Sequence, residues 1–371
     1  MRIDVVFPVL PPTIDGIGDH TALLSRALAN RADVRILTAQ EEYSPIPGVK
    51  VERGFTTDHR RGILRIVGAV KTRKPDWVFL QFNQFSYGRW GLNPFLPVAM
   101  RRIKESLPGT RIAWMVHEDY MPPTSFKRAV MSTWQRAQFQ RLGNVADVIF
   151  FSIEPWLEQY RDWFPDARLE HLPVGSNIPD ATMTRPESRT RMGVDEGVLL
   201  LGYFGAIRGD RRFDAVAALV HATARSGRDV RLLYVGPDVA RAREHLGSNH
   251  LIASGWLEPQ EAANTLMASD ILLAPYVDGA SSRRGGFLAG LQLGLATLGN
   301  VGALTDVSLA EKSDSAFLLA QDATTFAFVE AGLRLVGDPE LRKRLGRGAK
   351  ALFAERYAWP SIARSLYREL R

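Results

Sequence analysis

The sequence contains no cysteine, and this absence removes several kinds of chemistry at once. Disulfide bonds, thiolate catalysis and cysteine-ligated metal sites are all excluded. No stretch is long and apolar enough to cross a bilayer. The first apolar run is interrupted by Asp4 and ends at Pro8, so it predicts a buried strand and not a signal peptide. We therefore expect the protein to be cytoplasmic.

Motifs of several common enzyme classes are also missing. The chain has no Asp-x-Asp pair, no His-Glu-x-x-His zinc motif and no Gly-x-x-x-x-Gly-Lys-Ser/Thr loop. We therefore expect neither metal-dependent catalysis nor P-loop nucleotide hydrolysis, and no metal or other cofactor. No basic segment is interleaved with aromatic residues for stacking on single strands, so a nucleic-acid partner is not expected.

The composition is that of a globular protein with two domains. The chain has 371 residues, of which 46% are hydrophobic and 23% charged, and this length is sufficient for two separate cores. Its net charge is +7, with a sequence pI near 9.7. Such a surface favours anionic partners, for example nucleotides or phospholipid headgroups. The alternative is an ordinary solvated surface rich in arginine.

Short apolar runs alternate with amphipathic stretches along the whole chain, which predicts parallel α/β sheets with helices on both faces. The strands are expected at residues 3–9, 34–37, 77–80, 111–116, 148–151, 198–204, 231–235, 251–254, 270–275 and 296–298. The helices are expected at residues 21–30, 96–107, 125–142, 155–163, 213–226, 261–269, 286–293 and, with an interruption near Trp359-Pro360, 339–370. A polar, proline-bearing stretch follows Ile178, so we place the domain boundary between residues 178 and 179.

Three glycine-bearing turns follow predicted strands and precede helices. Such turns let backbone amides approach an anion, and the helix N-terminus adds a favourable potential. The first turn contains Gly16 and Gly18 but has Thr21 in place of the third glycine of the dinucleotide fingerprint, so a tight turn is an equally good interpretation. A cap from Asp19 or the preceding loop is expected there.

The other two turns combine glycine with arginine. Residues 205–212 carry Arg208 and Arg211, and residues 278–286 read Asp-Gly-Ala-Ser-Ser-Arg-Arg-Gly-Gly. Arginine at the carboxyl end of a parallel strand makes charge-assisted hydrogen bonds to phosphate oxygens. Taken alone, the turn at residues 205–212 is better explained as an exposed basic loop, but two such loops in one domain favour phosphate binding. His117 directly follows the strand at 111–116 and is a candidate to contact substrate or transfer a proton; the alternative is a structural histidine.

Taken in order, these motifs resemble the retaining GT-B glycosyltransferases that include phosphatidylinositol mannosyltransferases and bacterial polysaccharide transferases. The resemblance covers nearly the whole chain. It rests on residues 15–21, 117–118, 173–179, 204–208, 255–257, 274–276 and 357–359. It implies two Rossmann-like, doubly wound α/β domains that face a central cleft. Residues 1–178, with a final helix at 358–371 that crosses back, would hold the acceptor, and residues 179–357 would hold a nucleotide-diphosphate sugar.

The resemblance also implies roles for individual residues. Arg208 and Arg211 would contact the diphosphate, with Arg211 standing where the family more often has lysine. His117 would contact the transferred sugar. The remaining donor-site candidates lie in loops of the second domain or in the first turn: Gly16, Gly18, Ser281, Arg283, Arg284, the amides of Gly285, Gly286 and Phe287, and, for the base, Trp256 and Leu257. Family members typically retain anomeric configuration and need no metal, because arginines and helix dipoles stabilise the leaving charge.

The chain departs from the family at one important place. Two glutamates that place the donor sugar and bind the ribose are replaced here by Ser281 and Ala289. We expect Asp278 to substitute in part for a missing carboxylate. The leading hypothesis is therefore transfer of a hexosyl unit from a nucleotide-diphosphate sugar to a glycan, lipid-linked or natural-product acceptor. The alternatives are a non-catalytic GT-B protein that binds a nucleotide sugar or a partner transferase and, as a third possibility, a sugar epimerase.

One predicted helix also offers a membrane-binding hypothesis. Between residues 125 and 142 the chain combines basic side chains with aromatic ones: Lys127, Arg128, Arg136 and Arg141 with Phe126, Trp134 and Phe139. Such a helix can dock peripherally on anionic lipid at the inner face of the membrane. The competing interpretation is an amphipathic helix whose aromatic side chains pack on its own domain.

Overall fold

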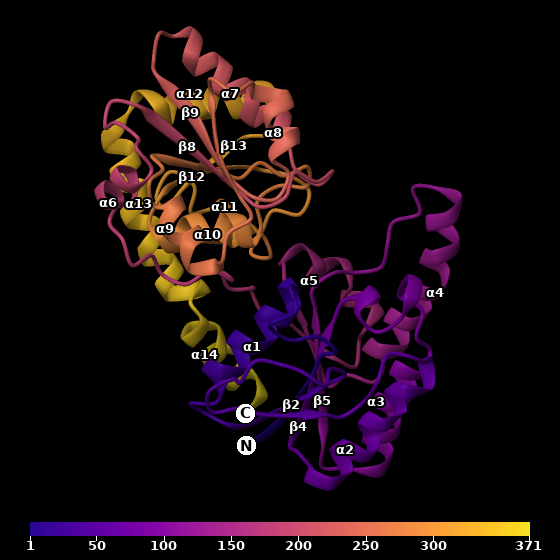
Figure 1. Ribbon diagram of the computed structural model, residues 1–371. Helices are drawn as coiled ribbons and strands as arrows, with labels where there is room; N and C mark the ends of the chain where they lie inside the picture. The colour runs from indigo at the N-terminus through magenta and orange to yellow at the C-terminus, as the bar shows by residue number, and fades with distance from the viewer. The chain divides into compact units, whose positions relative to one another are not determined.

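The computed structural model describes residues 1–371 and shows two compact α/β units. The first consists of Met1–Pro173 together with Trp359–Arg371, and the second of Val174–Ala358. The boundary thus follows Pro173, whereas the sequence placed it after Ile178. Figure 1 shows the C-terminal helix α14 (Trp359–Leu370), in yellow, beside the indigo helix α1 (Gly16–Leu28) of the first unit.

The first unit is built on a sheet of seven parallel strands in the order β3-β2-β1-β4-β5-β6-β7. The strands are β1 (Arg2–Val6), β2 (Asp33–Thr38), β3 (Lys50–Arg53), β4 (Trp77–Phe82), β5 (Arg111–Val116), β6 (Val148–Phe151) and β7 (Arg168–His171). Besides α1 and α14, its helices are α2 (Arg65–Arg73), α3 (Phe95–Ser106), α4 (Phe126–Gly143) and α5 (Pro155–Gln159), with 3₁₀ turns η1 (Arg60–Leu64), η2 (Gln84–Ser86), η3 (Arg89–Gly91) and η4 (Arg161–Trp163).

The second unit repeats this plan with six parallel strands in the order β10-β9-β8-β11-β12-β13. They are β8 (Leu199–Phe204), β9 (Val230–Val235), β10 (Leu251–Gly255), β11 (Ile271–Leu273), β12 (Ala296–Asn300) and β13 (Leu318–Ala320). Its helices are α6 (Arg185–Arg191), α7 (Phe213–Arg225), α8 (Val239–Leu246), α9 (Pro259–Leu266), α10 (Gly285–Leu293), α11 (Val307–Ala310), α12 (Thr325–Gly337) and α13 (Pro339–Leu352), which continues into a π-helical turn η5 (Phe353–Tyr357).

Both sheets are covered on their two faces, so their strands are apolar almost throughout. In the second unit, alternate residues of β8 enter two separate cores: Leu199, Leu201 and Tyr203 lie in one, and Leu200 lies in the other. In the first unit Ile3 and Val5 join the core formed with α1 and α14. None of the helices combines the length and apolar character needed to span a bilayer.

The strand order reverses direction once in each sheet, between β1 and β4 and between β8 and β11. At such a switch point the loops leave the carboxyl ends of the two strands in opposite directions and open a crevice, where open α/β sheets bind ligands. The glycine-bearing turns that follow β1, β8 and β11 all lie at these positions.

Candidate functional site

In the second unit, the turns after β8 and β11 meet at the switch point. Arg211 and Tyr276 form an antiparallel bridge between the two turns. The Arg211 guanidinium lies 5.1 Å from the centre of the Tyr276 ring and donates a hydrogen bond of 2.8 Å to the Phe204 carbonyl at the end of β8. Gly205, with φ +101°, turns the chain away from the strand at this point. The two arginine-bearing loops of the sequence therefore form one structural unit.

The Arg211 guanidinium is fixed by its hydrogen bond to Phe204 and lies beside the first turn of α10. A Cβ on Gly286 would lie 3.4 Å from an Arg211 Nη1 atom and 3.2 Å from the Phe204 carbonyl, so glycine allows the helix to approach this closely. Burial alone would lower the pKa of Arg211, but Tyr276, Tyr203 and Asp210 raise it above its ordinary value. The guanidinium is therefore charged at every physiological pH.

Arg208, in contrast, is exposed, and its side chain contacts no protein acceptor. The amides of Gly285 and Gly286 at the start of α10 likewise donate to no protein acceptor. The expected Phe287 amide is engaged, since it donates to the Arg284 carbonyl at 2.9 Å, and its ring is fully buried against Phe317. The donors left for an anion are thus one free guanidinium and two helix amides.

The loop between β11 and α10 is organised around Asp278. One carboxylate oxygen accepts from Arg283 at 2.7 Å and the other accepts from Arg284. Arg284 also reaches Asp210 of the neighbouring loop at 2.6 Å and covers the Tyr276 ring at 4.4 Å. Although burial opposes the charge, Asp278, Tyr276 and Asp210 raise the pKa of Arg284. Asp278 therefore orients two arginines, and both of its oxygens are occupied.

Trp256 and Leu257 follow β10, at the same edge of the sheet. Gly255 turns the chain with φ +75°, and the Trp256 ring is 52% exposed, while Leu257 is half-buried against the core below. An exposed indole at the carboxyl edge of a sheet presents a flat apolar surface suited to a nucleobase or sugar ring.

In the first unit, the turn after β1 is closed by its own residues. Asp15 is the N-cap of α1 and accepts hydrogen bonds from the amides of Ile17 and Gly18 at 3.0 and 2.7 Å. A Cβ on Gly18 would lie 2.8 Å from the Val9 carbonyl, so close packing explains this glycine. Asp19 lies within the first helical turn, where burial and the charge of Asp15 raise its pKa to about 6.

His117 follows β5 and lies next to a second histidine, His20 of α1, with ring centres 4.7 Å apart. Nε2 of His117 is 2.6 Å from Oε1 of Gln81. Burial lowers the pKa of His117 to about 3, and burial followed by the charge of His117 lowers that of His20. Both rings are therefore neutral near pH 7 and suit a hydroxyl group better than a phosphate.

No protein-family model and no curated protein sequence matches the chain. Solved structures match over its whole length. Sucrose-phosphate synthase from Thermosynechococcus elongatus is 15% identical with a TM-score of 0.72, and WaaG, a glycosyltransferase involved in lipopolysaccharide biosynthesis, is 14% identical with a TM-score of 0.68; both alignments cover 100% of this chain and 99% of the other. Anabaena HepE, solved in complex with UDP and glucose, is 14% identical with a TM-score of 0.65 over the same shares.

This chain has the GT-B fold. The prediction of two parallel α/β domains of the GT-B type is thereby confirmed. The site positions expected from the sequence all lie in turns or helix starts of this GT-B chain. No group of three or more histidine, aspartate or glutamate side chains is arranged to hold a metal ion.

The two positions where the sequence expects family glutamates are both fully buried. Ser281 is inaccessible, and its hydroxyl has no hydrogen-bond partner, while Ala289 packs in the core under α10. No acid replaces either one at the same place, and Asp278 is the carboxylate of this loop. Serine and alanine therefore fit the packed start of this helix, and the charged side chains of the loop are Asp278, Arg283 and Arg284, which pair with one another.

Sequence reasoning assigned no role to three residues that the GT-B structure places beside the candidate sites. Tyr276 lies under Arg211 and Arg284, Asp210 bridges to Arg284, and His20 contacts His117. A sequence signal for His20 did exist. It lies four residues after Gly16, which places both residues on the same face of the helix that follows the first glycine turn. No local pattern marks the other two, since their roles arise from the pairing of distant loops.

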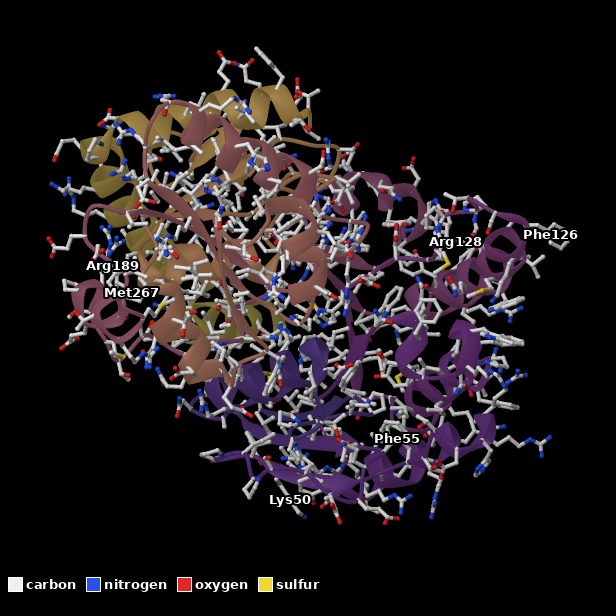
Figure 2. The ribbon with its side chains drawn as sticks, turned by 45° about the horizontal axis from the view of Figure 1, so that its top comes forward. Lys50, Phe55, Phe126, Arg128, Arg189 and Met267 are labelled. Carbon is white, nitrogen blue, oxygen red and sulfur yellow. The ribbon has the colours of Figure 1, made fainter.

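Helix α4 has only part of the surface that the membrane hypothesis requires. Phe139 is fully buried in an aromatic cluster, and Trp134 donates its indole N–H to the Trp90 carbonyl. Phe126 is 88% exposed, beside the exposed Lys127 and Arg128, and Figure 2 shows it pointing outward from the start of the helix. The aromatic face expected to meet lipid therefore mostly packs on its own unit.

The buried histidines predict a steep pH dependence of stability. The unfolded chain protonates this imidazole near 6.5, whereas the folded chain does so only near 3, so His117 favours folding above pH 6.5 and this contribution is lost as the pH falls. Between pH 6.5 and 5 the loss is about 2 kcal/mol. In urea unfolding across this range, His117→Gln should show a flatter profile than the wild type.

The exposed His59 provides the matched control, and His59→Gln should keep the wild-type slope. Asp19, whose raised pKa gives stability an opposite pH dependence, is present in all three proteins. Its contribution therefore cancels when each variant is compared with the wild type at the same pH. Equal slopes for the wild type and His117→Gln would contradict a buried neutral imidazole.

Proposed function

We propose that the protein is a glycosyltransferase that moves a hexosyl unit from a nucleotide-diphosphate sugar to a glycan, lipid-linked or natural-product acceptor. The observation that carries the proposal is the convergence of Arg211, Arg208 and the two free amides of Gly285 and Gly286 at the switch point of the second unit. These groups match a diphosphate: fixed donors at a helix start and one exposed, unpaired guanidinium.

The chemistry follows from where charge develops. As the bond between the anomeric carbon and the diphosphate breaks, negative charge grows on the leaving oxygen, and donors already in place stabilise it at little reorganisation cost. Arg211 is held by the Phe204 carbonyl and Tyr276, so it is preorganised. We propose that this stabilisation operates without a metal ion and that the reaction retains anomeric configuration.

The other candidates have supporting parts in this proposal. Asp278 orients Arg283 and Arg284 toward the phosphates, and Trp256 with Leu257 receives the base. The neutral His117 hydrogen-bonds a hydroxyl of a sugar substrate. Structures with the same fold were solved with UDP-glucose in HepE and with glucose-6-phosphate in a trehalose-phosphate synthase of Burkholderia xenovorans, which supports a nucleotide-sugar donor and a sugar acceptor.

We also propose a cytoplasmic location with peripheral contact at the inner face of the membrane, made by Phe126, Lys127 and Arg128 at the start of α4. Flotation with vesicles of anionic phospholipid at low salt tests this contact. Phe126→Ser should abolish the association, and protein that stays at the bottom of the gradient in the wild type would remove the contact from the proposal.

Arg208→Ala is the sharpest test of the donor site. Its side chain makes no native contact, so stability should change by less than about 0.5 kcal/mol. Loss of a charged hydrogen bond should weaken nucleotide binding at least about tenfold. Thermal shifts with UDP, GDP, ADP and dTDP, each with and without Mg²⁺, measure both, since a ligand at 100 times its Kd adds about 2.7 kcal/mol.

The exposed Arg225 in the last turn of α7 is the control, and Arg225→Ala should bind like the wild type. A shift with one nucleotide that Arg208→Ala loses supports the proposal and names the base. Absence of a shift with every nucleotide would overturn it. A shift without turnover of the matching nucleotide sugar would favour a non-catalytic binding protein, in line with the absent carboxylates at Ser281 and Ala289.

A further inference from the structure

The second unit has a basic pocket on the edge of its sheet opposite the proposed donor site. Its lining includes Ser269 and Asp270, which precede β11, and Leu295 and Ala296, which lead into β12. These are the amino ends of the strands, whereas the donor loops leave the carboxyl ends. The cavity has a volume of about 660 Å³, enough for a small molecule. It is therefore separate from the proposed transferase site.

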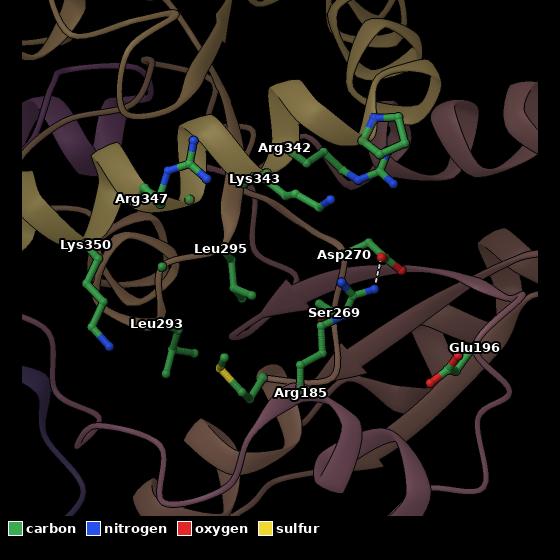
Figure 3. A pocket seen from close by; sticks show the side chains of 15 residues that line it. Arg185, Glu196, Ser269, Asp270, Leu293, Leu295, Arg342, Lys343, Arg347 and Lys350 are labelled. Atoms are coloured by element: carbon green, nitrogen blue, oxygen red, sulfur yellow. Dashed lines mark hydrogen bonds and ion pairs between the residues drawn. The ribbon is translucent and has the colours of Figure 1, made fainter.

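One wall of the pocket is a row of cations on α13. Lys343, Arg347 and Lys350 are spaced by four and three residues, so they occupy one face of the helix. Figure 3 shows these side chains and Arg342 along the helix, with Arg185, Leu293 and Leu295 across the hollow.

The charges of this wall are only partly balanced by the protein. Lys343 pairs with Glu340 at 2.8 Å, but Arg347 and Lys350 have no protein partner. Five cations and two carboxylates line the pocket. Of the carboxylates, Asp270 already accepts from Arg185, from Arg189 and from the Leu200 amide, and Glu196 lies at the far side of the hollow from α13 in Figure 3. An uncompensated positive field remains at the wall.

Such a row costs stability in the absence of an anion, because like charges one helical turn apart repel each other. Arg342, held by the carbonyls of Leu335 and Val336 at the end of α12, experiences the same field. Burial and the charges of Arg185 and Arg228 lower its pKa despite the opposing effect of Asp270. The crowding of cations is thus a property of the pocket as a whole.

The packing of α13 holds the row in place. A Cβ on Gly346 would lie 2.3 Å from the Gly294 carbonyl, so this glycine lets the helix touch the turn between α10 and β12. Leu341, Leu345 and Ala349 anchor the opposite face of α13 in the core. The cations therefore project from a rigid helix, and the geometry is preorganised for a ligand.

We propose that this pocket binds a phosphate or diphosphate group of a second ligand, distinct from the sugar donor. Arg347 and Lys350 supply the free charge, Arg342 and Arg185 line the remaining sides, and the apolar Leu293 and Leu295 form the floor. The group belongs to a soluble phosphate ester or to a lipid headgroup, which share this chemistry.

Isothermal titration with inorganic pyrophosphate tests the pocket, using the full chain carrying Arg208→Ala so that the proposed donor site is weakened. Binding should persist in this background and fall at least about tenfold when Arg347→Ala and Lys350→Ala are added. Arg344→Ala is the matched control, since Arg344 is an exposed cation on the same helix that does not line the pocket. It should leave the affinity unchanged.

A second arm distinguishes the sources. The protein is sedimented with vesicles of phosphatidylcholine and phosphatidic acid. If the wild type sediments with the vesicles and the Arg347→Ala, Lys350→Ala variant does not, the ligand is a lipid headgroup. If the protein binds pyrophosphate but not the vesicles, the ligand is a soluble ester. Removing the two unpaired charges should leave the melting temperature equal or higher, which shows that the variant is folded. Binding to neither probe, or an equal loss in Arg344→Ala, would overturn the proposal.

Discussion

Gly279→Ala is expected to lower the free energy of unfolding by about 3 kcal/mol and to weaken nucleotide binding at least about tenfold. Gly279 has φ +93°, a conformation that alanine adopts only with strain. An added Cβ would lie 2.2 Å from Oγ1 of Thr305 and 2.4 Å from the Gly302 amide nitrogen. The loop would have to move, and Asp278 with its two arginines would move with it.

Chemical denaturation and a nucleotide thermal shift measure the two effects on the same samples. Gly209→Ala is the matched control in the neighbouring loop, because a Cβ there meets no atom within 4 Å. That variant should keep wild-type stability within about 0.5 kcal/mol. A Gly279→Ala protein as stable as the wild type would show that the loop does not rest on residues 302–305.

Asp4→Ala should destabilise the protein by about 3–5 kcal/mol, because it leaves a buried positive charge without its main partner. Asp4 is fully buried in the middle of β1 and accepts hydrogen bonds of 3.0 and 2.5 Å from Arg35 of β2. Arg73 of α2 adds a third contact at 2.6 Å. Without the carboxylate, Arg35 stays buried with only Glu52 to balance it.

Asp33→Ala is the control, because Asp33 also pairs with Arg73 but is exposed, and its loss should cost less than about 1 kcal/mol. The double variant Asp4→Leu, Arg35→Leu should recover part of the loss, since apolar packing can replace a buried pair. Urea unfolding of the wild type and these three variants measures the differences. Equal destabilisation by Asp4→Ala and Asp33→Ala would contradict the buried pair.

The inner strands of the first sheet were predictable because they are buried on both faces and form continuous apolar runs in the sequence. Residues 77–80 and 148–151 appear in the structure as β4 and β6. Both edge strands of this first sheet were missed: β3 has the sequence Lys-Val-Glu-Arg, with both ends exposed, and β7 is Arg-Leu-Glu-His. An edge strand has fewer buried residues, so its pattern resembles a loop. Asp4 is a charged residue inside a buried strand, and the sequence could not explain it. Its partners, Arg35 and Arg73, are distant in the sequence.

The candidate site likewise has features that the sequence indicated and features that only the structure shows. The glycine and arginine content of the turns after β8 and β11 indicated an anion site, because such turns lie at carboxyl strand ends in any parallel sheet. The sequence could not show which arginine is free: Arg208 is, whereas Arg211, Arg283 and Arg284 are held by partners up to seventy-four residues away. It also could not show that the amides of Gly18 and Phe287 are used internally.

The C-terminal helix has a consequence for the order in which the protein is completed. The indole N–H of Trp77 donates to the Leu370 carbonyl at 2.8 Å, and Ile362, Leu366 and Leu370 lie in the same core as β1. The first unit is synthesised first, but its last helix, α14, is synthesised only after the whole second unit. During synthesis the second unit can fold as an uninterrupted segment, while the first exposes the apolar groove that α14 will fill. Chaperones that shield apolar surface should consequently engage the first unit for longer, although it is the older part of the growing chain.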